Sequence, residues 1–143
     1  MQIASTINAG ASSAKVTDTA DLVARITLAV IFVFSGADKL YFHTAGNVEY
    51  MHAVGLPLAT LLVYPVGLVE FAGGLLLAVG YQARIAAALL AAFTVAATLL
   101  FHQFWVAPAD QAVLQTVMFL KNVAIFGGLV HVFAHGSGRL KLG

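Results

Sequence analysis

The sequence predicts an all-α membrane protein, a four-transmembrane-helix bundle with both termini in the cytoplasm. Hydrophobic residues make up 61% of the 143 residues and charged residues only 9%, and the mean hydropathy is +0.94. A soluble domain normally carries about a quarter charged residues, so this chain is expected to contact the lipid bilayer. The net charge of +1, without a basic stripe, argues against nucleic acid as a partner. The lack of cysteine excludes thiol nucleophiles, thiolate-bound zinc and iron–sulfur sites.

Four apolar runs of roughly 20 residues have the length that crosses a bilayer. The segment before them, residues 1–21, is rich in Ala, Ser and Thr and lacks an apolar core, so we expect a disordered cytoplasmic tail there. Asn47 is expected to cap a short helix that stops at Gly55. The membrane domain is expected over residues 22–138, with spans at about 22–42, 58–79, 85–106 and 113–133, followed by a cytoplasmic tail over residues 139–143.

The basic residues set the expected orientation. Cytoplasmic loops carry an excess of Lys and Arg, and only Lys39 lies on the side opposite to the others. Both termini are therefore predicted in the cytoplasm, and residues 43–57 and 107–112 are predicted to face outward. The residues on the cytoplasmic side are Lys15, Arg25, Arg84, Arg139 and Lys141.

Glu70 lies near the middle of the second apolar run and is the first candidate for a functional site. An ionisable group at bilayer depth is costly and usually faces a partner or a wet cavity. Lys121 in the fourth run is the predicted partner, because Glu70 and Lys121 lie about 18 Å and about 12 Å below the outer ends of their spans at 1.5 Å per residue. Arg25 is set apart near the cytoplasmic face. The polar-core or ligand candidates are Glu70, Lys121, Asn122, Gln115, His102, Lys39 and Arg25.

Each of these features also has a purely structural interpretation. The Glu70–Lys121 pair could fix helix register without chemistry, and the basic residues could act only as orientation signals. Small residues let membrane helices approach closely, so the glycines are expected to serve packing. They are Gly36, Gly73, Gly74, Gly127 and Gly128.

Histidine and aromatic side chains offer weaker signals. His131 and His135 are spaced i,i+4 and could face a metal or haem together, but a helix C-terminus also favours a partly protonated imidazole. We assign no metal site. Phe104 and Trp105 are expected to anchor the chain at the membrane interface, with contact to a quinone ring as the alternative.

Taken together, these spaced residues resemble the DoxX family of small four-span membrane proteins over about Leu22 to Gly138. The resemblance implies a four-helix bundle in a bacterial inner membrane. It also implies an association with redox systems, such as thiosulfate:quinone oxidoreductase, terminal quinol oxidase subunits or oxidative-stress assemblies. The residues that carry it are Arg25, Gly36, Lys39, Gly55-Leu56-Pro57, Glu70, Gly73-Gly74, Gly80, Arg84, Gln115, Phe119-Leu120-Lys121-Asn122 and Gly127-Gly128.

Two classes of function follow. In the first, the chain is an accessory membrane subunit of a quinone-linked redox system, in which Glu70, Lys121 and His102 supply hydrogen bonds or protons to a quinone head. In the second, it is a non-catalytic scaffold or assembly protein that recruits a partner. A small-solute or lipid pathway is a weaker third alternative, since four helices enclose little volume unless they form a homo-oligomer. No catalytic residue is assigned, no cofactor is expected to be built in, and quinone is a candidate ligand under the first class only.

Overall fold

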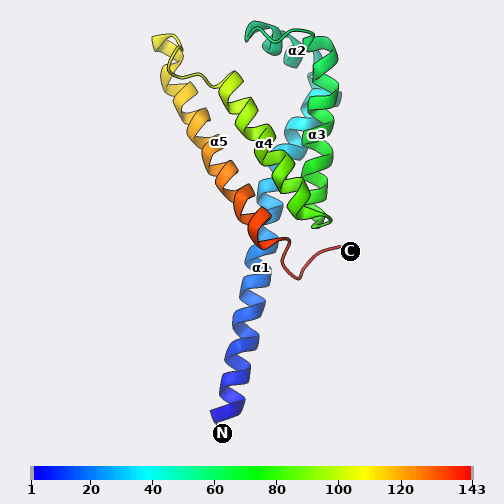
Figure 1. Ribbon diagram of the computed structural model, residues 1–143, viewed down its shortest axis with the longest axis vertical. Helices are drawn as coiled ribbons and strands as arrows, with labels where there is room; N and C mark the ends of the chain where they lie inside the picture. The colour runs from blue at the N-terminus through cyan, green and yellow to red at the C-terminus, as the bar shows by residue number, and fades with distance from the viewer. Residues whose placement is uncertain (1, 143) are drawn as a thin grey trace.

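The protein is helical along nearly the whole part of the chain that the structure describes, which is the backbone of residues 2–142 and the side chains of residues 14–142. This computed structural model contains α-helices and one π-helical turn, η1 (Figure 1). In chain order the elements are α1 (Gln2–Ala37), η1 (Asp38–Phe42), α2 (Thr44–Ala53), α3 (Ala59–Val79), α4 (Ala83–Phe101) and α5 (Ala109–His135). The all-α prediction is confirmed for these residues.

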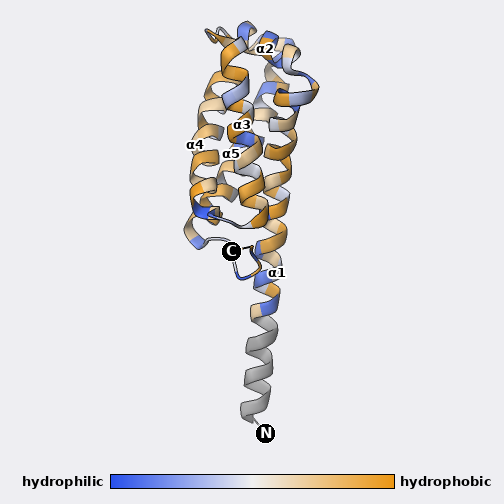
Figure 2. Cartoon of the chain, turned by 90° about the vertical axis from the view of Figure 1, so that its right-hand side faces the viewer, coloured by the Kyte–Doolittle hydropathy of each residue, from blue (hydrophilic) through white to orange (hydrophobic). Residues whose placement is uncertain are grey.

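Four of these helices are long and apolar enough to cross a bilayer, as predicted. Helix α3 has 21 residues and rises about 32 Å at 1.5 Å per residue, close to the thickness of the hydrocarbon core. Apolar residues cover the outside of the bundle (Figure 2), as expected of a surface that faces lipid. The candidate spans are Ala14–Phe42, Ala59–Val79, Ala83–Phe101 and Ala109–His135.

The N-terminal segment differs from its prediction. The backbone from Gln2 onward belongs to α1, whereas the sequence predicted a disordered tail through Asp21. Alanine has the highest helix propensity of all residues, and the Ala-rich composition that suggested disorder also favours helix. Helix α1 consequently continues past the ends of the other helices (Figure 1).

The third span is shorter than its prediction. Helix α4 ends at Phe101, whereas the sequence predicted a span to Val106. The backbone leaves the helix at His102, which has a φ of −125°. Phe104 and Trp105 lie beyond this point and pack edge to face, with ring centroids 5.2 Å apart. Their apolar side chains extended the hydropathy signal past the real end of the helix.

The helices pack as two pairs, α1 along α3 and α4 along α5. A tight turn with Gly80 at a φ of 77° joins α3 to α4, the left-handed conformation that glycine adopts at helix ends without strain. The pairs meet in an apolar core that includes Phe32, Leu77, Leu90 and Leu129. Toward α2 the pairs diverge (Figure 1). We call the two ends of the bundle the α2 end and the C-terminal end.

Gly36 allows α1 to approach the backbone of α3 closely. A Cβ atom on Gly36 would lie 2.4 Å from the backbone nitrogen of Phe71 and 2.7 Å from the carbonyl oxygen of Gly67. Neither backbone atom can move easily, so Gly36 packs as predicted. Gly127 does not, because nothing lies within 4 Å of the position of its Cβ. Its predicted packing role is therefore wrong within this chain.

Candidate functional site

Glu70 forms a buried ion pair with Lys39. The Nζ atom of Lys39 lies 2.8 Å from the Oε2 atom of Glu70, and the two side chains are only 15% and 6% exposed. Ser35 completes the group, because its hydroxyl donates to Oε1 of Glu70 at 3.0 Å and accepts from Lys39 at 2.8 Å. Ser35 and Lys39 are four residues apart and so share one face of the chain toward α3. The carboxylate is thus held by two side chains of α1 and η1.

The predicted pairing of Glu70 with Lys121 is wrong. Lys121 is exposed, and its amine donates to the Sδ atom of Met118 at 3.3 Å. The physical reason is the arrangement of the helices, since α3 packs along α1 whereas α5 packs along α4. Depth along a span, which the sequence supplies, does not say which neighbour a helix faces.

Glu70 and Lys121 nevertheless line one cavity of about 410 Å³. Residues of both helix pairs and of α2 line the cavity, and the two pairs diverge toward the α2 end (Figure 1). Its wall is mainly apolar, with Ile31, Phe93 and Ile125 from three different helices. The polar or charged residues that line it are Ser35, Lys39, Asn47, Tyr50, Glu70, Thr94, His102, Lys121 and Asn122. The structure therefore brings together most of the candidates that the sequence singled out, although not in the predicted pairs.

His102 and Gln115 contact each other near the α2 end. Nδ1 of His102 and Oε1 of Gln115 are 3.0 Å apart, so Gln115 can fix the ring of His102 although it does not itself line the cavity. Neither residue was predicted to bind the other. His102 lies at the end of α4 and Gln115 near the start of α5, and the short connection between these helices brings them together.

Helix α2 lies over the end of the cavity. Tyr50 stacks on Phe101 with ring centroids 5.3 Å apart, and Met51 is only 3% exposed. Asn47 was predicted to cap this helix, but α2 begins three residues earlier, at Thr44. The amide of Asn47 instead donates to Oδ2 of Asp38 at 2.8 Å. Asn47 thus ties α2 to η1, the turn that carries Lys39.

Arg25 lies outside this site, at the C-terminal end of the bundle. Its side chain is 1% exposed and donates to the carbonyl oxygens of Leu140 at 2.8 Å, Ala78 at 3.4 Å and Ser137. The segment after α5 is also held by a backbone hydrogen bond from Leu142 to α3. Arg25 therefore fastens the C-terminal segment across the bundle and does not reach the cavity.

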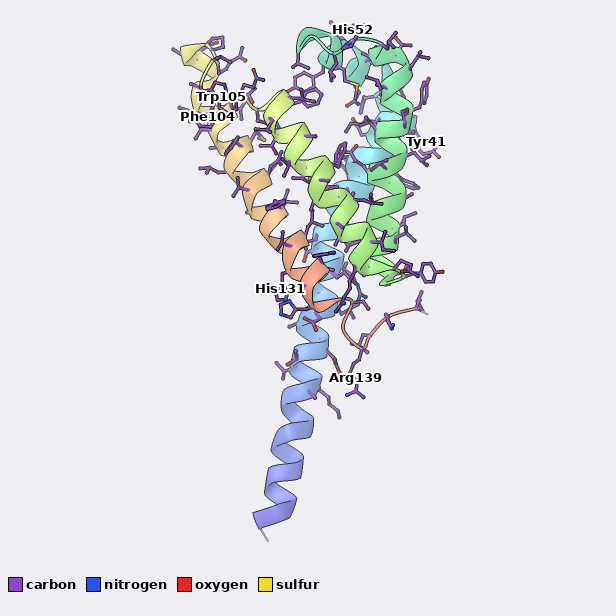
Figure 3. The ribbon with its side chains drawn as sticks, in the orientation of Figure 1. Tyr41, His52, Phe104, Trp105, His131 and Arg139 are labelled. Carbon is purple, nitrogen blue, oxygen red and sulfur yellow. The ribbon has the colours of Figure 1, made fainter. Side chains whose placement is uncertain are left out.

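The remaining candidates also lie away from the cavity. His131 and His135 stack with ring centroids 4.2 Å apart, but both are exposed on the last turns of α5, and His131 lies near the C-terminal end (Figure 3). Within the described residues no cluster of three His, Asp or Glu side chains is placed to hold a metal. Phe104 and Trp105 lie at the opposite end (Figure 3) and pack against Phe119.

Ser35, Tyr50 and Thr94 line the cavity but were not among the candidates from the sequence, and of these Ser35 contacts the ion pair. The four-residue spacing of Ser35 from Lys39 was the available signal, since a hydroxyl and an ammonium at this spacing share a helix face. The sequence placed Lys39 near the outer end of the first span. It did not connect Lys39 with Glu70.

Comparison with known proteins identifies the family. A sequence model of the DoxX family matches residues 20–103. The Escherichia coli K12 inner membrane protein YqjF is 35% identical, over 90% of this chain and 92% of YqjF. The inner membrane protein YphA of the same organism is 28% identical, over 85% of this chain and 86% of YphA. No solved structure matches the chain. The chain therefore belongs to the DoxX family and is a multi-pass protein of the inner membrane.

Proposed function

We propose that this protein is an accessory subunit of a quinone-linked redox system and that its cavity binds the quinone head group. One observation carries the proposal, namely that an ion pair and an imidazole line a mainly apolar cavity between helices that are long and apolar enough to cross a bilayer. The volume of about 410 Å³ lies in the range of small-molecule pockets, which combine apolar walls with a few polar groups. A quinone has matching parts, an apolar ring with two carbonyl acceptors.

The cavity residues supply three kinds of contact to such a ligand. Lys39 is a hydrogen-bond donor for a ring carbonyl oxygen, and Glu70 holds the ammonium of Lys39 in one place. Nδ1 of His102 donates to Oε1 of Gln115, so Nε2 of the neutral ring is an acceptor for a hydroxyl of the reduced quinol. Phe93 and Phe101 line the same cavity and offer aromatic faces for the quinone ring. The chain's part in the proposal is to bind and orient the quinone, and electron transfer is assigned to a partner protein of the redox complex.

The scaffold alternative is favoured by a different observation. The ion pair joins η1, the continuation of α1, to α3 beside the contact at Gly36, and a buried polar group can fix the register of two helices without any chemistry. In that case the cavity residues stabilise the bundle while its surface recruits a partner. The two proposals differ in whether a ligand is needed.

Extraction of bound quinone from the purified protein tests the quinone proposal. Replacement of Ala97, which lines the cavity, with Phe fills the space without changing charge. Replacement of Ala92 on the exposed face of the same helix is the matched control. We expect quinone to co-purify with the wild type and the Ala92→Phe variant and to be lost from the Ala97→Phe variant. Equal quinone in both variants, or none in the wild type, contradicts the proposal.

A further inference from the structure

Lys121 is a charged residue of the cavity that no carboxylate neutralises. The cavity is lined by three charged residues, Lys39, Glu70 and Lys121. Lys39 and Glu70 neutralise each other across 2.8 Å. Within the described part of the chain Lys121 forms no ion pair, and its amine donates to the sulfur of Met118 at 3.3 Å. The cavity wall therefore carries an excess positive charge at Lys121.

The depth of Lys121 makes this charge costly. It lies near the middle of α5, an apolar candidate span that runs from Ala109 to His135. Ammonium groups at such a depth normally face a partner or a wet cavity, and thioether sulfur is only a weak acceptor. An anionic ligand would supply the missing partner. Asn122 follows directly and also lines the cavity, adding an amide donor beside the ammonium.

The shape of the cavity suits an amphiphile that comes from the bilayer. Helices α1 and α5 touch where Leu28 lies beside Gly128 and diverge from there toward the α2 end (Figure 1). In that diverging part both helices line the cavity, through Ile31 on α1 and Ile125 on α5. Ile31, which is also exposed on the outside of α1, thus lies in the same cavity wall as Lys121.

We propose that the cavity binds an anionic amphiphile, with its acidic head on Lys121 and Asn122 and its hydrocarbon chain along the apolar wall. This goes beyond the quinone proposal, because a neutral quinone head needs no cation and Lys121 is not among its donors. Both ligands would occupy the same cavity, so the anionic amphiphile would compete with quinone. The acidic head is a carboxylate or a phosphate, the anionic groups that free long-chain acids and phospholipids carry.

Equilibrium binding to the purified full-length protein in detergent tests this inference. The probes are oleate, its uncharged methyl ester and dioleoylphosphatidylglycerol. We expect the wild type to bind oleate or the phospholipid at least about tenfold more tightly than the ester, because only the anionic probes gain a hydrogen bond between two charged groups. Lys121→Gln should lose this preference and Lys121→Arg should keep it. Lys15→Gln, on the exposed part of α1, is the charge-matched control.

Each outcome decides the inference. Preference for oleate alone identifies a carboxylate ligand, preference for the phospholipid alone identifies a phosphate ligand, and both support the proposal. Binding of oleate and of the phospholipid by the wild type no tighter than that of the methyl ester overturns it, even if the Lys121→Gln variant fails to fold. Unchanged preference in Lys121→Gln also overturns it. The quinone content of the same samples is also measured. Absence of quinone from the wild type contradicts the quinone proposal, whereas absence of a preference for the anionic probes contradicts this inference.

Discussion

Removal of the ammonium of Lys39 should destabilise the bundle through Glu70. In the Lys39→Met variant the carboxylate, whose side chain is only 6% exposed, loses its counter-ion and keeps one hydrogen bond from Ser35. Breaking a well-buried pair typically costs 3–5 kcal/mol. Because the side chain of Lys39 is 15% exposed, we expect the lower end of that range, about 3 kcal/mol.

The double variant Lys39→Met with Glu70→Gln should recover much of this loss, because neither side chain then carries a charge that needs a partner. A double-mutant cycle isolates the coupling between the two residues. We expect a coupling free energy of about 2 kcal/mol for Glu70 with Lys39. The same cycle for Glu70 with Lys121 should give less than about 0.5 kcal/mol, the value expected for residues that share no partner.

The free energy of unfolding is measured by denaturant titration of the purified variants in mixed micelles. The Lys121 cycle is the internal control, since it changes the same kind of side chain in the same cavity. Coupling of Glu70 to Lys121 that exceeds its coupling to Lys39 would refute the arrangement described above.

Three further results are expected. Gly36→Leu should prevent folding, because its Cβ would meet backbone atoms at 2.4 and 2.7 Å, whereas Gly127→Leu should be tolerated; equal melting temperatures of the two variants would contradict this. Arg25→Gln should free the C-terminal segment and speed its removal by carboxypeptidase, at a loss of about 1.5–3 kcal/mol for hydrogen bonds to a charged group; a cleavage rate equal to the wild type would argue against the fastening role. Reporter fusions should place Gln82 in the cytoplasm and Asp110 outside, and the reverse result would contradict the predicted orientation.

The number and approximate place of the spans could be predicted from the sequence because the bilayer acts as a solvent. A helix must be apolar over roughly 20 residues to cross it, and this requirement is visible in hydropathy alone. Hydropathy does not define the ends of the spans as well, because apolar side chains also occur just outside a helix. Phe104 and Trp105 are apolar but lie in the connection after α4, where aromatic side chains settle at the membrane interface.

The partner of Glu70 could not be predicted, because sequence position gives the depth of a residue but not the side of the helix that faces each neighbour. The contact of α1 with α3 depends on Gly36 meeting backbone atoms of α3. Only the three-dimensional packing shows that this contact brings Ser35 and Lys39 to Glu70. Lys121 was expected near Glu70, and it lines the same cavity from the opposite helix pair.

The binding of a quinone head in the cavity is tested most directly by photolabelling. A photoreactive quinone analogue is cross-linked to the protein in membranes, and the modified residues are identified by peptide mass spectrometry. We predict labels on residues that line the cavity, such as Phe93 and Phe101, and their loss when excess unlabelled quinone is added. Labels confined to lipid-facing residues such as Leu89 and Leu120, unaffected by unlabelled quinone, would contradict the proposed site.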